Sequence, residues 1–135
     1  MKYLKFIVLS LLVFVVALSC FYWKNDIPLE TLKSKYTTAA SAFVDVMQMQ
    51  VHYRDEGNKN DSLPLVLIHG TGASLHTWEE SVKLLTDSFR VITLDLPAYG
   101  LTGPNPKRIY SQAFYVQFID EFLKSIHVNK CIIGG

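Results

Sequence analysis

The sequence predicts an α/β fold with a mostly parallel sheet and flanking helices, preceded by one transmembrane helix. Two observations predict it: an uncharged, mostly apolar run over residues 6–23, and downstream apolar runs that alternate with segments of helical periodicity. Alternating strand and helix units form mostly parallel sheets with right-handed crossovers. The formal net charge of +1 over 135 residues offers no basic patch, so we expect no nucleic-acid partner.

The N-terminal run has the length of a membrane-spanning helix, since about 18 residues cover about 27 Å of bilayer. Phe21, Tyr22 and Trp23 follow it like an aromatic belt, and lysines precede it, which favours a cytoplasmic N-terminus. We predict a cytoplasmic segment (1–5), a signal anchor (6–23), a tether (24–41) and an exported folded domain (42–135). A cleaved signal peptide and a lipoprotein anchored through Cys20 are the alternatives, and both also export the domain.

Two patterns predict the first strands. Residues 47–54 alternate strictly, with Met47, Met49, Val51 and Tyr53 on one face and Gln48, Gln50, His52 and Arg54 on the other. This period predicts a half-buried antiparallel strand near a sheet edge. A polar turn over residues 57–62 follows. Apart from Pro64, residues 63–68 are continuously apolar, which predicts a parallel strand covered on both faces.

The remaining elements continue the alternation. Thr77 and Glu80 have capping-box spacing, and Trp78, Val82 and Leu85 share one helical face. Residues 90–94 form a buried strand. Phe114, Phe118, Phe122 and Ile126 recur every four residues, and Tyr115, Ile119 and Leu123 widen that stripe, which predicts a helix with a broad buried face. Cys131 opens a third buried strand; with Cys20 in the apolar run, we expect no disulfide.

Two loops rich in small residues follow these strands, at residues 69–74 and 95–100. Ligands of open α/β sheets bind beyond the carboxyl ends of the strands. Glycines there bring backbone N–H groups close to a ligand, and a developing oxyanion needs such donors. The motifs of phosphate-binding loops are absent, so these loops favour an oxyanion-type site.

Three segments, in order, resemble the α/β-hydrolase family: residues 51–57, residues 67–74 with Trp78, and residues 91–104. The resemblance implies that the backbone N–H of Thr71 is an oxyanion-hole donor, with Gly72 as the alternative donor and a plain turn as the competing interpretation of Thr71. It also implies that His69, Gly70 and Asp95 support the loops, and that no metal or organic cofactor takes part.

Three positions depart from the family pattern. Ala98 stands where the family usually has Gly, and because Ala disfavours a positive φ we expect a slightly altered loop. Thr102 stands where Ser is frequent. Met47 and Gln48 replace a common Asp-Gly or Asn-Gly turn, which leaves the pairing of the first strand open.

The nucleophile elbow G-x-S-x-G is expected at the end of the strand that Cys131 begins. If Gly135 is its first glycine, the nucleophile, acid and histidine of the triad all lie beyond this chain. Residues without such a context, which we expect at the surface or in structural roles, are Ser74, Ser81, Ser111, Ser125, His52, His76 and His127.

The leading hypothesis is a membrane-anchored hydrolase that cleaves ester or related acyl bonds of small molecules with a Ser-His-Asp/Glu triad. A dehalogenase or epoxide hydrolase with an Asp nucleophile and a non-catalytic gene remnant are the alternatives. We expect the 135-residue chain alone to be inactive and unstable, because an unpaired apolar strand edge promotes aggregation.

Overall fold

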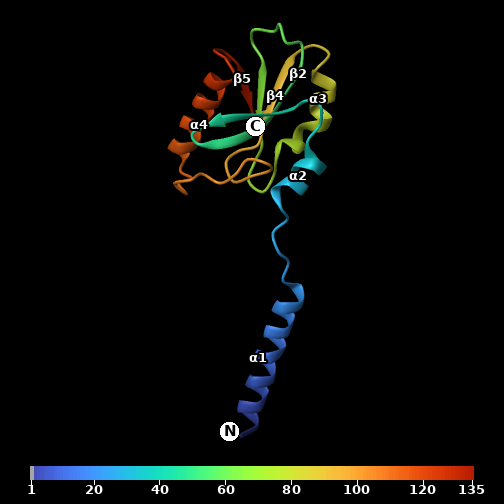
Figure 1. The fold of residues 1–135 in the computed structure, drawn as a ribbon, viewed down its shortest axis with the longest axis vertical. Coiled ribbons are helices and arrows are strands. Elements are labelled where there is room, and N and C mark those ends of the chain that lie inside the picture. Colours follow the sequence, from blue (N-terminus) through green and yellow to red (C-terminus); the bar gives the residue numbers. More distant parts are fainter. Residues whose placement is uncertain (1) are drawn as a thin grey trace.

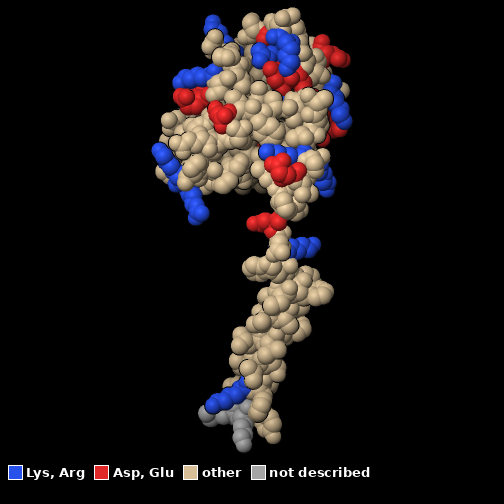
Figure 2. Space-filling model, in the orientation of Figure 1, with Lys and Arg blue, Asp and Glu red and all other residues tan. Residues whose placement is uncertain are grey.

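Helix α1 (Lys2–Tyr22) stands apart from the folded domain in the computed structural model, which describes residues 2–135 (Figure 1). Figure 2 shows it as a rod without charged side chains between its two ends. The span Tyr3–Tyr22 has a mean hydropathy of 2.6 and none of it is buried. It is therefore long and apolar enough to cross a membrane, a property that a signal sequence near the N-terminus shares.

The domain is built on a five-stranded mixed sheet in the order β1-β2-β4-β3-β5. The strands are β1 (Ser41–Val46), β2 (Met49–Gly57), β3 (Leu65–Ile68), β4 (Arg90–Leu94) and β5 (Ile132–Gly134). Strand β3 is parallel to β4 and to β5, whereas β2 is antiparallel to β1 and to β4. The α/β architecture predicted from the sequence is confirmed.

A two-residue turn joins β1 to β2. Both residues of the turn, Met47 (φ 49°) and Gln48 (φ 67°), have left-handed backbone conformations, as a type I′ hairpin turn requires. The side chains of Gln50 and Asp45 are hydrogen bonded across its mouth. The predicted strand over residues 47–54 therefore begins two residues later, at Met49, because its first two residues make the turn.

Both faces of β2 are covered, so the predicted half-buried strand is wrong. Met49 and Val51 face the core, as expected, but His52 (0% exposed) and Arg54 (6%) on the opposite face are buried too. Arg54 donates to Glu79 at 2.8 Å and to the carbonyl oxygen of Tyr36 at 3.2 Å. Segments distant in the sequence cover this face, and alternation within one strand does not reveal them.

Helices lie on both sides of the sheet, with α4 (Gln112–Ser125) on one side and α3 (Glu79–Leu85) on the other (Figure 1). The stripe of α4 is confirmed, since Phe118 and Phe122 are fully buried. Ser111 caps this helix by accepting the N–H of Phe114 at 3.2 Å. The core that α4 closes also contains Val46, Met49, Val51, Val66, Ile92, Leu94 and Val128.

The capping box at Thr77 is wrong, because Thr77 lies inside a 3-10 turn, η1 (Leu75–Trp78). Helix α3 starts only after that turn, and no side chain caps it. The backbone N–H of Thr77 donates to the carbonyl oxygen of Ser74 at 3.0 Å, and the N–H of Leu75 is held by Asp95 instead. A distant carboxylate therefore decides where this helical segment begins.

Helix α2 (Leu29–Tyr36) forms inside the segment interpreted as a tether. Eight residues are too few for a stable isolated helix in water, so contacts with the domain hold it. The ring of Tyr36 packs edge-on against His76 at 5.5 Å, and its carbonyl oxygen accepts from Arg54. Sequence patterns showed no helix here because its support is tertiary.

Strand β5 is not buried as predicted, since Ile132 is 51% and Ile133 53% exposed. Among the described residues β5 pairs with β3 alone, and no described element covers its other edge. An open apolar groove of ≈ 480 Å³ separates β5 and α4; Ile68, Leu96, Tyr115, Ile119, Leu123 and Ile133 contribute to its walls.

Candidate functional site

The two loops singled out in the sequence begin side by side, because Ile68 at the end of β3 lies opposite Leu94 at the end of β4. Strand β5 runs along the other side of β3, with Gly134 opposite Leu67. Figure 1 shows both loops at the end of the domain from which α1 extends. This is the edge where open α/β sheets bind their ligands.

His69 joins the two loops. Its imidazole is buried (3% exposed); Nε2 accepts the N–H of Leu96 at 3.0 Å, and Nδ1 lies 2.8 Å from the carbonyl oxygen of Gly70. Because Nε2 accepts, the neutral ring carries its proton on Nδ1 and donates it to that oxygen. The ring also packs edge-on against Tyr99 at 5.4 Å. This placement fits the loop-supporting role predicted for His69 and Gly70.

Thr71 and Gly72 form the exposed tip of the first loop. A hydrogen bond from the N–H of Ala73 to the carbonyl oxygen of Gly70, 3.3 Å long, closes the turn. Gly72 has φ 75° and open space around its Cα, so its conformation rather than crowding requires glycine. Within residues 2–135, nothing accepts the N–H of Thr71 or of Gly72. Their role as oxyanion donors stays a prediction.

The carboxylate of Asp95 (1% exposed) ties three segments together. Oδ1 accepts the N–H of Leu75 at 2.8 Å, Oδ2 accepts the N–H of Leu101 at 2.9 Å, and Oδ2 lies 2.8 Å from Nδ1 of His52. Burial raises the pKa of Asp95, but these hydrogen bonds, that of His52 foremost, outweigh it and bring the pKa below its ordinary value. The carboxylate is therefore ionised at neutral pH.

The sequence did not reveal the partners of Asp95. His52 lies in the middle of β2, and its Nε2 is 2.9 Å from Oγ of Ser41 at the start of β1. Its backbone N–H donates to Oγ1 of Thr102 at 3.0 Å. The sequence did hold a usable signal, because an Asp directly follows β4. A strand that pairs with β4 in the antiparallel sense places one of its residues beside that Asp, and here this residue is His52.

The loop after β4 is tightly built. Ala98 adopts a left-handed conformation (φ 70°), although its Cβ disfavours this conformation by about 1 kcal/mol. Gly100 (φ 52°) is indispensable, since an added Cβ would lie 2.2 Å from the Asp95 carboxylate. Thr102 supplies a hydroxyl acceptor to His52, a function that Ser at this position could also serve.

The other candidate Ser and His side chains lie apart from these loops or make local contacts, except Ser74, which is the last residue of the loop 69–74. Ser125 donates to the carbonyl oxygen of Glu121 at 2.7 Å, and His76 pairs with Glu79 at 2.7 Å. His127 is exposed just after α4, with φ 56°. Ser81 lies within α3, and Ser74 directly precedes η1. Across residues 2–135, no three His, Cys, Asp or Glu side chains gather as a metal site would require.

Comparisons with known proteins agree with this geometry. Residues 64–135 match the family model described as alpha/beta hydrolase fold. The chain is 30% identical over 74 residues to a pimeloyl-[acyl-carrier protein] methyl ester esterase of Legionella pneumophila (strain Lens), covering 55% of this chain and 30% of that protein. It is 27% identical over 88 residues to epoxide hydrolase 4 of Homo sapiens, covering 64% and 24%, respectively.

A solved structure matches nearly the whole chain. The crystal structure of a membrane phospholipase A, described as a novel bacterial virulence factor, superposes with a TM-score of 0.66 at 26% identity. The match covers 98% of this chain and 43% of that one. The chain thus spans less than half the length of each of these three proteins. From its strand order, its two site loops and these matches, the chain belongs to the alpha/beta hydrolase fold family, and relatives named within it are hydrolases.

Proposed function

We propose that residues 42–135 are the N-terminal part of a membrane-anchored hydrolase domain that cleaves ester or related acyl bonds in small molecules. One observation carries the proposal: Thr71 and Gly72, just past the end of β3, are exposed residues whose N–H groups have no acceptor within residues 2–135. The ring of His69 holds the loop that contains them through its hydrogen bonds to Gly70 and Leu96. Backbone donors held in this way stabilise the oxyanion of an acyl-transfer transition state.

The end of β5 supports a nucleophile beside that loop. Gly134 lies opposite Leu67, and a Cβ added to Gly135 would lie 2.9 Å from the carbonyl oxygen of Ile68. Such close approach fits the first glycine of a G-x-S-x-G elbow, whose serine would stand two residues further on. In the whole enzyme that serine attacks the carbonyl, a histidine serves as base and then acid, and Asp or Glu orients the histidine.

The backbone N–H of Thr71 can be tested by a matched pair of variants in the enzyme that continues past Gly135. Thr71→Pro removes the N–H, whereas Thr71→Ala keeps it and removes only the side chain. We expect Thr71→Pro to lower kcat about 10²- to 10³-fold, as for the loss of one oxyanion donor, and Thr71→Ala to change it less than about threefold. Equal activities of the two variants would reject Thr71 and leave Gly72 as the alternative donor.

A second candidate function uses an aspartate nucleophile, as in an epoxide hydrolase. It is favoured by the 27% identity to epoxide hydrolase 4. The codon two positions after that of Gly135 separates the candidates: Ser supports ester or acyl cleavage, and Asp supports the second function. A stop codon at that place would instead support a non-catalytic gene remnant.

The 135-residue chain itself is proposed to be inactive and prone to self-association. It holds no serine in an elbow context, and half-exposed Ile132 and Ile133 leave an apolar strand edge open. Purified monomeric chain should therefore leave a p-nitrophenyl ester unhydrolysed. Turnover above that of a Thr71→Pro control would contradict this expectation.

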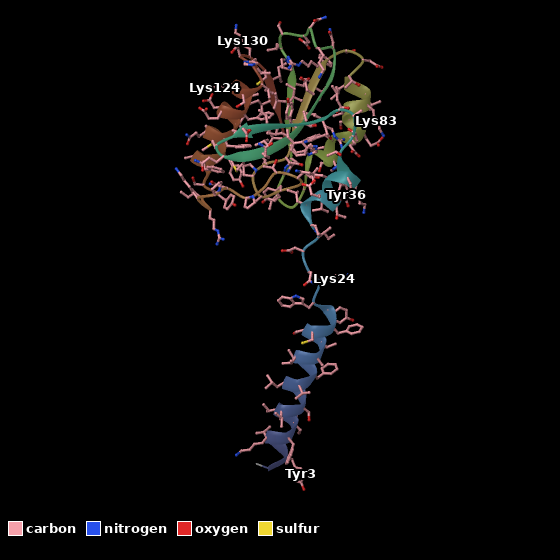
Figure 3. The ribbon with its side chains drawn as sticks, in the orientation of Figure 1. Tyr3, Lys24, Tyr36, Lys83, Lys124 and Lys130 are labelled. Atoms are coloured by element: carbon pink, nitrogen blue, oxygen red, sulfur yellow. The ribbon has the colours of Figure 1, made fainter. Side chains whose placement is uncertain are left out.

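Membrane anchoring through α1 is part of the proposal, with the N-terminus in the cytoplasm and the domain exported. The exposed apolar span of α1 supports it, as does the likeness to a membrane phospholipase A. Figure 3 shows Tyr3 and Lys24 at opposite ends of the helix, and Lys24 on the side of the domain. The loops at the α1 end of the domain (Figure 1) would then face the bilayer.

Mass spectrometry of the membrane fraction tests the anchor. A retained anchor leaves an intact N-terminus, whereas a lipoprotein begins at a lipid-modified Cys20 and a cleaved signal peptide gives a shorter, released protein. Labelling of an Asp26→Cys variant in intact cells by a membrane-impermeant maleimide tests the orientation. Labelling only after cell lysis would reverse it.

A further inference from the structure

Three side chains, one of them on β2, are joined by hydrogen bonds and have no part in the proposed reaction. Oγ of Ser41 lies 2.9 Å from Nε2 of His52, and Nδ1 of His52 lies 2.8 Å from Oδ2 of Asp95. The side chain of His52 is 0% exposed and that of Asp95 1%. Buried polar groups of this kind are costly unless every one of them is hydrogen bonded.

The carboxylate of Asp95 sets the direction of its hydrogen bond with His52. An ionised carboxylate only accepts, so Nδ1 of His52 donates to Asp95. Nε2 of His52 is hydrogen bonded to Oγ of Ser41. Oγ of Ser41 in turn accepts the N–H of Thr38 at 3.1 Å. The result is a continuous chain of hydrogen bonds from the backbone of Thr38 to the carboxylate of Asp95.

Asp95 connects these hydrogen bonds to both site loops. Its Oδ1 accepts the N–H of Leu75, which directly follows the loop 69–74, and its Oδ2 accepts the N–H of Leu101 in the loop after β4. A carboxylate free to rotate about its last bond could not hold both donors. His52 removes that freedom, because it occupies Oδ2 from a strand in the sheet.

The other end of the chain reaches the segment that leads to α1. Thr38 follows directly after the C-cap of α2, Thr37, and the N–H of Ser41 donates back to the carbonyl oxygen of Thr38 at 3.0 Å. Figure 3 labels Tyr36, the last residue of α2, at the end of the domain nearer the membrane helix. These hydrogen bonds therefore link the side of the domain nearer α1 with the loop that contains Thr71.

We propose that Ser41 and His52 are positioning residues: through Asp95 they hold the start of η1 and so fix the oxyanion loop 69–74. Neither residue touches the reacting atoms. The effect on catalysis rests on the proposed hydrolase function, whereas the effect on the loops does not.

Two substitutions of His52 separate its two hydrogen bonds. In His52→Asn the amide nitrogen takes the place of Nδ1 and keeps the donor to Asp95. In His52→Gln the amide takes the place of Nε2, which keeps the contact with Ser41 and removes the donor to Asp95. The two variants are otherwise alike in polarity, so each is the control of the other.

Amide hydrogen exchange of the full 135-residue chain in detergent micelles reads the loops directly. In His52→Gln we expect the amides of Leu75 and Leu101 to exchange about tenfold faster or more, the effect of losing a hydrogen bond to a charged group. In His52→Asn they should stay within about threefold of the parent chain. The amides of Phe118 and Phe122 in α4 should be unchanged in both. Unchanged exchange at Leu75 and Leu101, or equal acceleration in α4, would overturn the proposal.

Kinetics of the enzyme that continues past Gly135 test the catalytic consequence. We expect His52→Gln to lower kcat about tenfold with KM within about twofold, and His52→Asn to recover most of kcat, because the oxyanion donor acts in the transition state. A rise in KM with kcat unchanged would overturn the positioning role. If the parent enzyme itself has no activity, the proposed function is rejected. The exchange experiment would still decide whether His52 holds the loops.

Ser41 needs a separate test, because a Ser-His-Asp chain is also the arrangement of an activated nucleophile. We expect no labelling of Ser41 by a fluorophosphonate probe, and an Oγ that serves only as a hydrogen-bonding group. In Ser41→Ala the exchange of Leu75 and Leu101 should rise about two- to threefold, less than in His52→Gln. Covalent labelling at Ser41 would overturn the positioning role.

Discussion

The two loops at the carboxyl ends of β3 and β4 are both rich in small residues, yet they differ in what their backbone groups do. In the loop 69–74, Thr71 and Gly72 are exposed residues whose N–H groups donate to nothing within residues 2–135. The loop after β4 is crossed by hydrogen bonds, and the buried carboxylate of Asp95 holds it. One loop leaves backbone donors free, and the other is held by its own hydrogen bonds.

Both loops contain residues with positive φ, but of these only Ala98 carries a Cβ and is strained by it. Ala98 and Gly100 have positive φ in the supporting loop, and Gly72 has it in the presenting loop. Strained conformations persist only where the surroundings over-determine them. At Gly100 the surroundings are the Asp95 carboxylate itself, whereas Gly72 has open space. A substitution should therefore harm stability in the first case and the presentation of donors in the second.

Gly100→Ala should break the comparison most strongly. Its Cβ would lie 2.2 Å from the Asp95 carboxylate, at a residue with φ 52°, and we expect a loss of about 4 kcal/mol in the free energy of unfolding. Gly103→Ala is the matched control, because its Cβ would meet nothing within 4 Å, and it should cost less than about 1 kcal/mol. Urea unfolding of the enzyme that continues past Gly135, monitored by circular dichroism, measures both. Similar losses in the two variants would refute the steric argument.

Asp95→Asn should have the next largest effect. The amide keeps the shape of the side chain but weakens the hydrogen bonds from Leu75 and Leu101 and opposes the one from His52. We expect a loss of about 2 to 3 kcal/mol at neutral pH. Chemical denaturation at pH 7 checks it, and an unchanged midpoint would contradict the supporting role of Asp95.

The pH dependence of stability sharpens the role of this carboxylate. Because the pKa of Asp95 is lower in the folded state than in the unfolded state, its contribution is fully present above the unfolded pKa and is lost as the pH falls through the folded pKa. The stability difference between the parent chain and Asp95→Asn should thus be larger at pH 7 than at pH 3. Denaturation curves between pH 3 and pH 7 test this, and a difference independent of pH would argue against it.

Ala98→Gly should have the smallest effect and the opposite sign. Ala98 holds φ 70°, which glycine adopts without the steric cost of a Cβ. We expect stabilisation of up to about 1 kcal/mol, reduced by the greater freedom of glycine in the unfolded chain. Thermal unfolding gives the sign. A destabilised variant would mean that the loop does not impose a left-handed conformation at this residue.

Several elements could be predicted because local pattern and tertiary surroundings agree. The bounds of β4, Arg90–Leu94, follow from its apolar run, and the stripe of α4 ends in the core as its spacing predicts. The placement of the loops after β3 and β4 followed from the same alternation. Strand β5 shows the opposite case: its apolar residues predict a buried strand, but they do not reveal that no described element covers them.

By itself the sequence determined the apolar span of α1, the alternation of strands and helices, and the two loops where a hydrolase site is expected. Only the tertiary structure decided that β2 is covered on both faces, that Met47 and Gln48 form its turn, and that His52 links Ser41 to Asp95. The reason is physical: periodicity reports which face of an element is apolar, whereas the partner of a buried polar group comes from wherever the chain returns.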